Sequence, residues 1–325
     1  MSVPVPLLIN PRAGSLFRSG LKTWLRKHRR AFRLVTTESA EDLTTKAREL
    51  AESGEPVVAA AGGDGTLMCA AQGLVGTEAA LGILPCGTMN VFARELGIGS
   101  RRFDVALQAI QGGQRQEVDI FAVNGRPFLQ VAGFGPDARV IELITPELKK
   151  RMGAAAHVLT GINAAMEKPA LITLTMPDGE TLQGTQVIMG NGKRYGGEAH
   201  LFADAAYDDG RLDAAIIDQE NLGVLFEVLG LIVAKGAAPH NISEFTNLRR
   251  IKHCEITADA ELPYHLDGDY AGTLIPGDKL RIERMPYKLK VCVPAECEPT
   301  SPLDRLLAHP MFVALKEKLR AFNEL

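Results

Sequence analysis

Short apolar runs alternate with helix-like segments over the first 85 residues, and this alternation restricts the fold more than any other feature. Runs that are apolar nearly throughout predict strands buried on both faces, as in a parallel sheet covered by helices. The expected strands are Leu7–Asn10, Phe32–Thr36, Val57–Ala61 and Leu81–Pro85, and the expected helices are Phe17–Arg30, Ala40–Ser53 and Thr66–Val75. The chain should therefore begin with an α/β domain.

The pattern changes after about Gly125. Asp178-Gly179 separates the β-type runs Leu171–Met176 and Thr181–Met189, and Asp-Gly favours a tight hairpin turn. Further β-type runs and two helical stretches follow: Leu212–Ile217, Cys254–Ala258, Lys279–Arg284, Leu289–Val293, then Ala154–Met166 and Leu222–Val233. Since 325 residues exceed one typical core, we expect an α/β domain over residues 1–124 and a mostly antiparallel β-sandwich domain over residues 125–299. A helix over residues 300–325 should pack back on the first domain.

Composition excludes several classes of protein. The content of 46% hydrophobic and 23% charged residues is that of a globular protein, and a net charge of -3 argues against a nucleic-acid partner. Pro4 and Pro6 interrupt the apolar N-terminus, so no secretory signal is expected, and no apolar stretch has the roughly 18 residues of a membrane span. Five cysteines without a CxxC pair indicate reduced thiols in a cytoplasmic protein.

Three loops follow expected strands of the first domain: Asn10–Ser15, Gly62–Thr66 and Pro85–Asn90. Ligands of open parallel sheets bind beyond the carboxyl ends of the strands, which is where these loops should lie. Glycines allow backbone N–H groups to approach phosphate oxygens, and the helix expected from Thr66 adds its positive dipole end. The alternative is that they are only glycine-rich turns, but three at one edge favour an anion site.

Asp64 stands among these glycines, where a carboxylate repels phosphate unless a cation lies between them. This arrangement favours magnesium. Other nucleotide-binding motifs fit less well, because GxxxxGK[ST], HRDxxxxN and DFG are absent and Met68 replaces the third glycine of a GxGxxG pattern that begins at Gly63.

The motifs together carry a family resemblance. They are Asn10-Pro11, Gly62–Thr66, Gly87–Asn90, Gly133–Asp137, Asn191–Gly197, Asp208–Asp213 and His265–Asp269. In this order, over nearly the whole chain, they resemble the diacylglycerol kinase catalytic family, which includes sphingosine, ceramide and bacterial lipid kinases. The resemblance implies an NAD kinase/diacylglycerol kinase-like fold and an ATP-dependent enzyme that phosphorylates a lipid hydroxyl in phospholipid metabolism.

The resemblance also implies the nucleotide site. ATP would lie between the domains with Mg²⁺, and its phosphates would meet the glycine loops. The implied cofactor-binding residues are Asn10, Pro11, Arg12, Ala13, Gly14, Thr37, Gly62, Gly63, Asp64, Gly65, Thr66, Gly87, Thr88 and Asn90.

Asp269 matches the family position of the proton acceptor, and with Asp64 it forms the implied catalytic pair. The family usually has Glu there, and Asp is one methylene shorter. Because small displacements are costly in positioned reactions, either the loop compensates or Asp269 acts through water.

The auxiliary magnesium site of the family maps onto Asp209, with main-chain oxygens of Ala206 and Arg211 as co-ligands. The alternative interpretation of Asp208–Gly210 is a turn before a strand. Two departures affect metal and acceptor geometry: Met68-Cys69 replaces the Asn-Glu of many relatives, and Phe202–Ala205 replaces a more usual Ala-Pro-x-Ala.

Two other functions stay open: a soluble NAD kinase-like phosphotransferase and a non-catalytic nucleotide- or lipid-binding homologue. Diacylglycerol, ceramide, a sphingoid base and other lipid alcohols all remain candidate acceptors. Homodimerisation is also left open.

A basic segment, Phe17–Arg33, predicts peripheral contact with an anionic membrane. Its apolar stripe of Leu21, Trp24 and Leu25 should pack on the sheet while its cations face lipid. The C-terminal stretch Leu303–Phe322 is the rival membrane contact.

Overall fold

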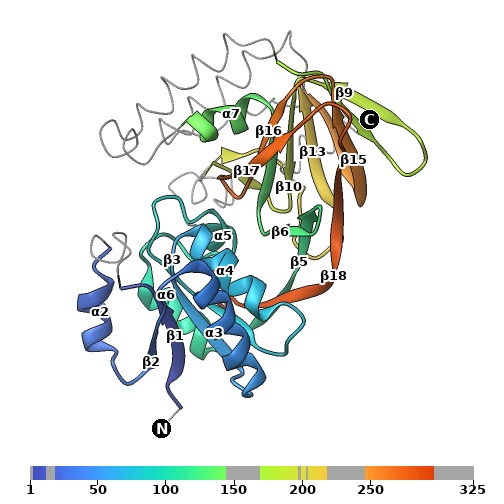
Figure 1. The fold of residues 1–325 in the computed structure, drawn as a ribbon. Coiled ribbons are helices and arrows are strands. Elements are labelled where there is room, and N and C mark those ends of the chain that lie inside the picture. Colours follow the sequence, from blue (N-terminus) through green and yellow to red (C-terminus); the bar gives the residue numbers. More distant parts are fainter. Residues whose placement is uncertain are drawn as a thin grey trace, which may run out of the picture.

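A computed structural model of the protein describes residues 3–11, 19–143, 169–196, 199–202, 204–217 and 246–295. The described chain has an α/β part near the N-terminus and a β-rich part beyond it (Figure 1). The helices expected near 154–166, 222–233 and 300–325 lie outside the described residues.

A parallel sheet forms the centre of the α/β part. Its strands run in the order β2-β1-β3-β4, and each neighbouring pair is parallel. β3 and β4 are buried at every position, as expected for strands covered on both faces, while β2 at the edge is mostly exposed. The strands are β1 (Val5–Ile9), β2 (Phe32–Thr36), β3 (Val57–Gly62) and β4 (Ala80–Pro85), so the predicted strands are confirmed within two residues.

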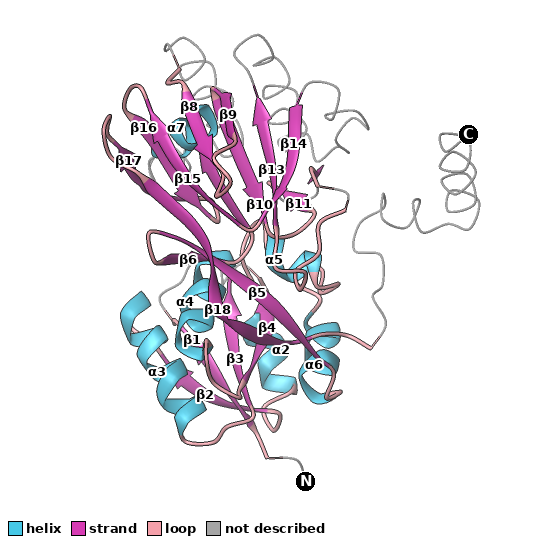
Figure 2. Cartoon of the chain, turned by 90° about the vertical axis from the view of Figure 1, so that its right-hand side faces the viewer, coloured by secondary structure: helices cyan, strands magenta, loops and turns pink. Residues whose placement is uncertain are grey.

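Helices cover both faces of this sheet (Figure 2). α3 and α4 pack together on one face, and α6 packs on β4 from the other. Leu21 of α2 is buried, and Trp24 and Leu25 are partly buried against the same core, which confirms that the apolar stripe packs inward. The helices are α2 (Leu21–Lys27), α3 (Ala40–Glu52), α4 (Asp64–Leu74), α5 (Val91–Glu95) and α6 (Phe103–Gln111).

The second part is a sandwich of two sheets, as predicted. One is a six-stranded antiparallel sheet in the order β14-β13-β10-β7-β16-β17, and the other contains β18, β15, β8 and β9. Phe121, Phe134, Met189 and Ile256 belong to the apolar core of this part. The strands are β7 (Val131–Phe134), β8 (Ile172–Thr175), β9 (Thr181–Gly184), β10 (Gln186–Gly190), β13 (Leu212–Ile217), β14 (Thr246–Ile251), β15 (His253–Ala258), β16 (Leu262–Leu266), β17 (Asp269–Leu274) and β18 (Leu280–Cys292).

Two strand predictions were wrong in their extent. The run Thr181–Met189 splits at Thr185, so that β9 pairs with β8 in one sheet while β10 pairs with β7 and β13 in the other. Conversely, Lys279–Arg284 and Leu289–Val293 belong to one strand, β18, whose register shifts between Arg284 and Lys288. Alternation of apolar residues does not reveal which sheet a strand joins.

β5 (Arg115–Val123) and β18 run between the two parts (Figure 1). They pair antiparallel along most of their length, and Val291 near the end of β18 pairs with Leu81 of β4. The boundary expected near Asn124 stays a prediction, and the chain returns to the α/β part through β18. The remaining short elements are β6 (Arg126–Phe128), α7 (Pro136–Leu143), β11 (Arg194–Tyr195) and β12 (Ala199–His200).

Candidate active site

The glycine loops after β3 and β4 pack against each other backbone to backbone. The N–H groups of Cys86 and Gly87 donate to the carbonyl of Gly62 at 2.8 and 3.2 Å. A Cβ atom at Gly87 would lie 2.5 Å from the Cα of Gly63, closer than real contacts allow. These glycines are therefore required by the neighbouring loop, a role that local sequence reasoning did not identify.

Asn90 shapes the second loop from within. It is fully buried and has a positive φ of 50°. Its side-chain amide donates to the Gly87 carbonyl and to Ser100 Oγ, both at 2.8 Å, and its Oδ1 accepts the Gly87 N–H at 2.8 Å. Asn90 thus supports the loop, while Thr88 beside it is exposed. Direct contact of either residue with nucleotide stays a prediction.

Asp64 opens α4 and lies close to the start of α5. Its Oδ1 accepts the N–H of Phe92 at 3.1 Å. Burial raises the pKa of Asp64, and hydrogen bonds from the N–H groups of Phe92, Val91 and Asn90 oppose that rise. The carboxylate therefore connects the two glycine loops in addition to any role toward a ligand.

Asp269 of the sandwich part faces the N-terminal turn of α4. A Cβ atom at Gly65 would lie 3.2 Å from Asp269 Oδ2. Both residues are exposed. Burial raises the pKa of the Cys69 thiol, and the negative charges of Glu41 and then Asp269 raise it further. Tertiary structure thus brings together the predicted phosphate loop and the predicted proton acceptor, 204 positions apart (from 65 to 269) in the sequence.

Asp267 anchors the turn that carries Asp269. Asp267 and Gly268 have φ values of 52° and 85° and join β16 to β17, as in a two-residue hairpin turn. The Asp267 carboxylate accepts three backbone N–H groups at 2.7 to 2.9 Å, from Leu129, Gln130 and Val131. Burial raises the pKa of Asp267 to about 6 against these bonds, and the nearby charge of Asp64 adds to the rise. Both oxygens of the Asp267 carboxylate are thus bonded to backbone, and the role of Asp269 as proton acceptor stays a prediction.

Thr37 and the first loop are only partly described. Thr37 follows β2, its N–H donates to the Ile9 carbonyl at 2.9 Å, and its side chain is 1% exposed. Its hydroxyl has no hydrogen-bond partner among the described residues, although a buried hydroxyl normally has one. Contact of Thr37 with nucleotide stays a prediction. Asn10 and Pro11 follow β1, whereas Arg12, Ala13 and Gly14 lie outside the described residues.

Both carboxylate oxygens of Asp209, the predicted magnesium ligand, bond to other groups of the protein. Its Oδ1 accepts the N–H of Arg211 at 2.9 Å, and its Oδ2 pairs with Arg250. Ala206 and Arg211 are exposed. No group of three His, Cys, Asp or Glu side chains that could hold a metal occurs in the part of the chain that the structure describes. The bonds to Arg211 and Arg250 fit the alternative interpretation, a turn before β13, and the magnesium role of Asp209 stays a prediction.

Asp119 of β5 holds this turn, and the sequence reasoning missed it. The side chain is 1% exposed; its Oδ2 accepts the N–H of Gly210 at 2.7 Å, and its Oδ1 accepts from Arg284 at 3.0 Å. A carboxylate within the apolar run Val118–Val123 was the available signal, because buried charges are rare unless paired.

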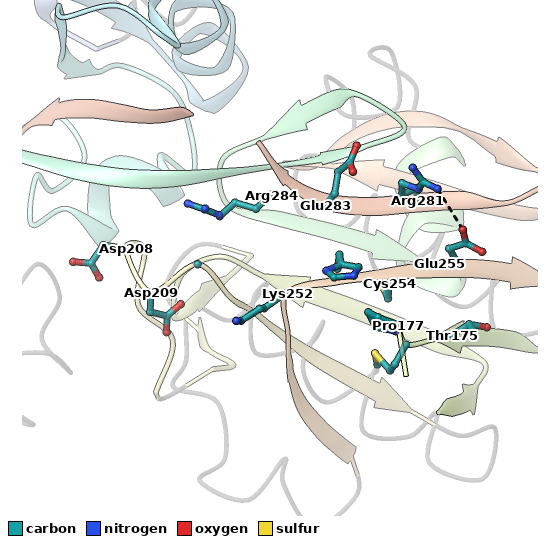
Figure 3. A pocket seen from close by; sticks show the side chains of 13 residues that line it. Thr175, Pro177, Asp208, Asp209, Lys252, Cys254, Glu255, Arg281, Glu283 and Arg284 are labelled. Atoms are coloured by element: carbon teal, nitrogen blue, oxygen red, sulfur yellow. Dashed lines mark ion pairs between the residues drawn. The ribbon is translucent and has the colours of Figure 1, made fainter. Parts of the chain in front are cut away.

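A cavity of about 820 Å³ lies beside the same turn (Figure 3). Asp209 and Arg284 lie near one end, while Glu255 and Arg281, which form an ion pair, lie along the wall. Its lining carries charges of both signs and includes no residue of the two glycine loops and not Asp269. It therefore lies apart from the glycine loops and Asp269, and it includes the turn with the predicted magnesium ligand Asp209.

Comparisons with known proteins find matches over most of the chain. The family model for the diacylglycerol kinase catalytic domain matches residues 4–123, and that for the YegS C-terminal NAD kinase beta sandwich-like domain matches residues 130–293. A diacylglycerol kinase of Bacillus subtilis is 28% identical over 86% of this chain and 93% of its own length. A "Probable lipid kinase YegS-like" protein of Pseudomonas aeruginosa strain UCBPP-PA14 is 34% identical over 76% of this chain and 80% of its own length.

Solved structures share the fold. A diacylglycerol kinase structure from Bacillus anthracis superposes with a TM-score of 0.65 at 20% identity, over 90% of this chain and 97% of that one. A yeast NADH kinase structure superposes with a TM-score of 0.52 at 10% identity, over 95% and 88%. At these identities the likeness concerns the fold alone. The two matched domains and the 34% identical relative show that the chain belongs to the diacylglycerol kinase-like family of lipid kinases.

Proposed function

We propose that the protein transfers the γ-phosphate of ATP to the hydroxyl group of a lipid alcohol. The observation that carries this proposal is the approach of Asp269, from the sandwich part, to Gly65 in the first turn of α4. Phosphate bound at the helix N-terminus would then lie beside a carboxylate able to accept the hydroxyl proton. The names of the relatives, diacylglycerol kinase and lipid kinase, support a lipid acceptor.

The chain's own residues would act mainly by positioning. The N–H groups in the first turn of α4 have no partners within the helix and can bind phosphate oxygens. Asp269 would hold the acceptor hydroxyl and take its proton as that oxygen bonds to the γ-phosphorus, while the bond from this phosphorus to the bridging oxygen breaks and ADP leaves. Magnesium bound with ATP would supply charge neutralisation. Asp209 is engaged by Arg250 and by the Arg211 N–H, and we assign no step to a protein-held ion.

A product assay tests the proposal. The protein is incubated with labelled ATP and, separately, diacylglycerol, ceramide, a sphingoid base or NAD, and products are resolved by thin-layer chromatography. We expect label in one lipid class, with Asp64→Asn losing most of it while remaining folded, because Asn keeps the oxygen that accepts from Phe92 but removes the charge. Label in NAD would favour a soluble phosphotransferase, and no product from any acceptor would favour a non-catalytic homologue.

We also propose that an exposed basic surface brings the enzyme to anionic membranes. Arg26, Lys27, Arg29 and Arg30 are exposed at the end of α2 and in the following turn, beside a hollow of about 560 Å³. Trp24 and Leu25 pack on the core instead, so attachment would be electrostatic and without insertion. In the described part of the chain no helix has the length and apolar character needed to cross a bilayer.

Changing these four cations together to Gln should weaken sedimentation with vesicles that contain anionic phospholipid. Each cation near such a surface contributes about 1 kcal/mol, and salt screens the attraction. A variant with the same change in charge on the sandwich part, at Lys193, Lys252, Lys279 and Arg281, serves as the control. Vesicle binding that changes neither with salt nor with the four substitutions would contradict the proposal that this basic surface contacts the membrane.

A further inference from the structure

Three buried polar side chains lie together beneath the turn that carries Asp269. Asp137, in the first turn of α7, His265 of β16 and Tyr195 of β11 are 2%, 1% and 5% exposed. Asp137 Oδ2 lies 3.0 Å from His265 Nε2 and accepts from Tyr195 OH at 3.0 Å. Asp137 Oδ1 accepts the Ala138 N–H at 2.6 Å, so both carboxylate oxygens are satisfied.

The second ring nitrogen of His265 extends this network into the turn. Its Nδ1 accepts the N–H of Gly268 at 3.3 Å. An imidazole whose Nδ1 accepts carries its proton on Nε2, and that proton then points to Asp137. The bonds therefore run from Tyr195 through Asp137 and His265 to Gly268, the residue immediately before Asp269.

The surrounding backbone is shaped to hold the pair. A Cβ atom at Gly133 would lie 2.2 Å from both Asp137 Oδ2 and His265 Nε2, so the two side chains occupy the space above this glycine. On the outer side, a Cβ atom at Gly268 would meet nothing within 4 Å among the described residues. The turn is thus held from beneath, by Asp267 and by the bond to His265.

We propose that Asp137 and His265 are positioning residues, which fix the Asp267-Gly268 turn so that Asp269 faces the first turn of α4. The inference rests on the proposed function, because it concerns the orientation of the group that accepts the proton. Misplacement by about 1 Å can cost about 100-fold in a positioned reaction. A role in the core alone would instead make every substitution of His265 act through stability.

Two amide variants of His265 separate these roles. The side-chain oxygen of Asn can replace Nδ1 as the acceptor for Gly268, whereas the side-chain NH₂ of Gln can replace Nε2 as the donor to Asp137. We expect His265→Gln to lose about tenfold or more in kcat with an unchanged KM for ATP. We expect His265→Asn to keep kcat within about threefold while its thermal midpoint falls, because Asp137 loses a donor.

Hydrogen–deuterium exchange gives a readout that does not depend on turnover. The backbone amides of a peptide spanning residues 262–274, which contains Gly268, should exchange faster in His265→Gln than in His265→Asn or the unaltered protein. The expected difference comes from the Gly268 N–H, which loses its acceptor only in His265→Gln. Equal exchange and equal activity in the two variants, or the reverse order, would overturn the positioning role. Wild-type protein that labels no lipid would contradict the proposed function instead. The exchange result would still show whether His265 holds the Asp267-Gly268 turn.

Discussion

We expect Asp269→Asn to lower kcat about 100-fold, with a change of less than about threefold in the KM for ATP. A group that takes the acceptor proton acts in the transition state, so its loss should appear in kcat and not in ground-state binding of nucleotide. The amide has nearly the same size as the carboxylate, and the side chain is exposed, so stability should not change. Steady-state rates with the lipid identified by the product assay provide the measurement.

Two further variants control this result. Asp278→Asn makes the same change in charge at another exposed residue of the sandwich part and should leave both constants unchanged. Asp269→Glu retains the carboxylate and should keep more activity than the amide. If Asp269→Asn turns over at the wild-type rate, Asp269 is not the proton acceptor, and the anchoring of Asp267 to three backbone N–H groups gives no reason to move the role there.

Replacing Gly87 with alanine should disrupt the nucleotide loops. The new Cβ atom would lie 2.5 Å from Gly63 Cα and 2.8 Å from Asn90 Oδ1, and neither can move freely, since one is backbone and the other is hydrogen bonded within the loop. Such overpacking lowers the free energy of unfolding by about 1–3 kcal/mol. The displaced loop should also no longer lie correctly relative to Asp64.

Gly63→Ala is the matched comparison. Its Cβ atom would lie 3.2 Å from Gly87 Cα, a tight contact that a small shift relieves. Urea unfolding should therefore show a lower midpoint for Gly87→Ala than for Gly63→Ala, and ATP-dependent labelling should follow the same order. Equal midpoints for both variants and the parent protein would show that the two loops do not pack as described.

The α/β part could be predicted from sequence because its signals are local. β2 begins and ends at the predicted residues, and β3 extends one residue beyond its predicted end. Continuous apolar runs favour buried strands in any context, and parallel strands necessarily bring their carboxyl ends to one edge. The glycine loops at that edge, with Asp64 among them, follow from the same two facts.

Tertiary structure decided what depends on distant partners. The sequence alone does not show that Thr181–Met189 divides between two sheets, or that β5 and β18 run through both parts, because pairing depends on which complementary face is available for burial. Nor does it show that Arg250 pairs with Asp209, where the family resemblance implies a magnesium ligand.

The same contrast applies within the candidate active site. The family resemblance implied Asp64 and Asp269 separately, but only the packing of the sandwich on the α/β part places Asp269 Oδ2 beside Gly65. The supporting bonds of Asp119, Asp137 and His265 are likewise formed between segments far apart in the chain. The sequence shows which polar residues the chain contains, whereas the geometry of the folded core determines which partner each buried one bonds.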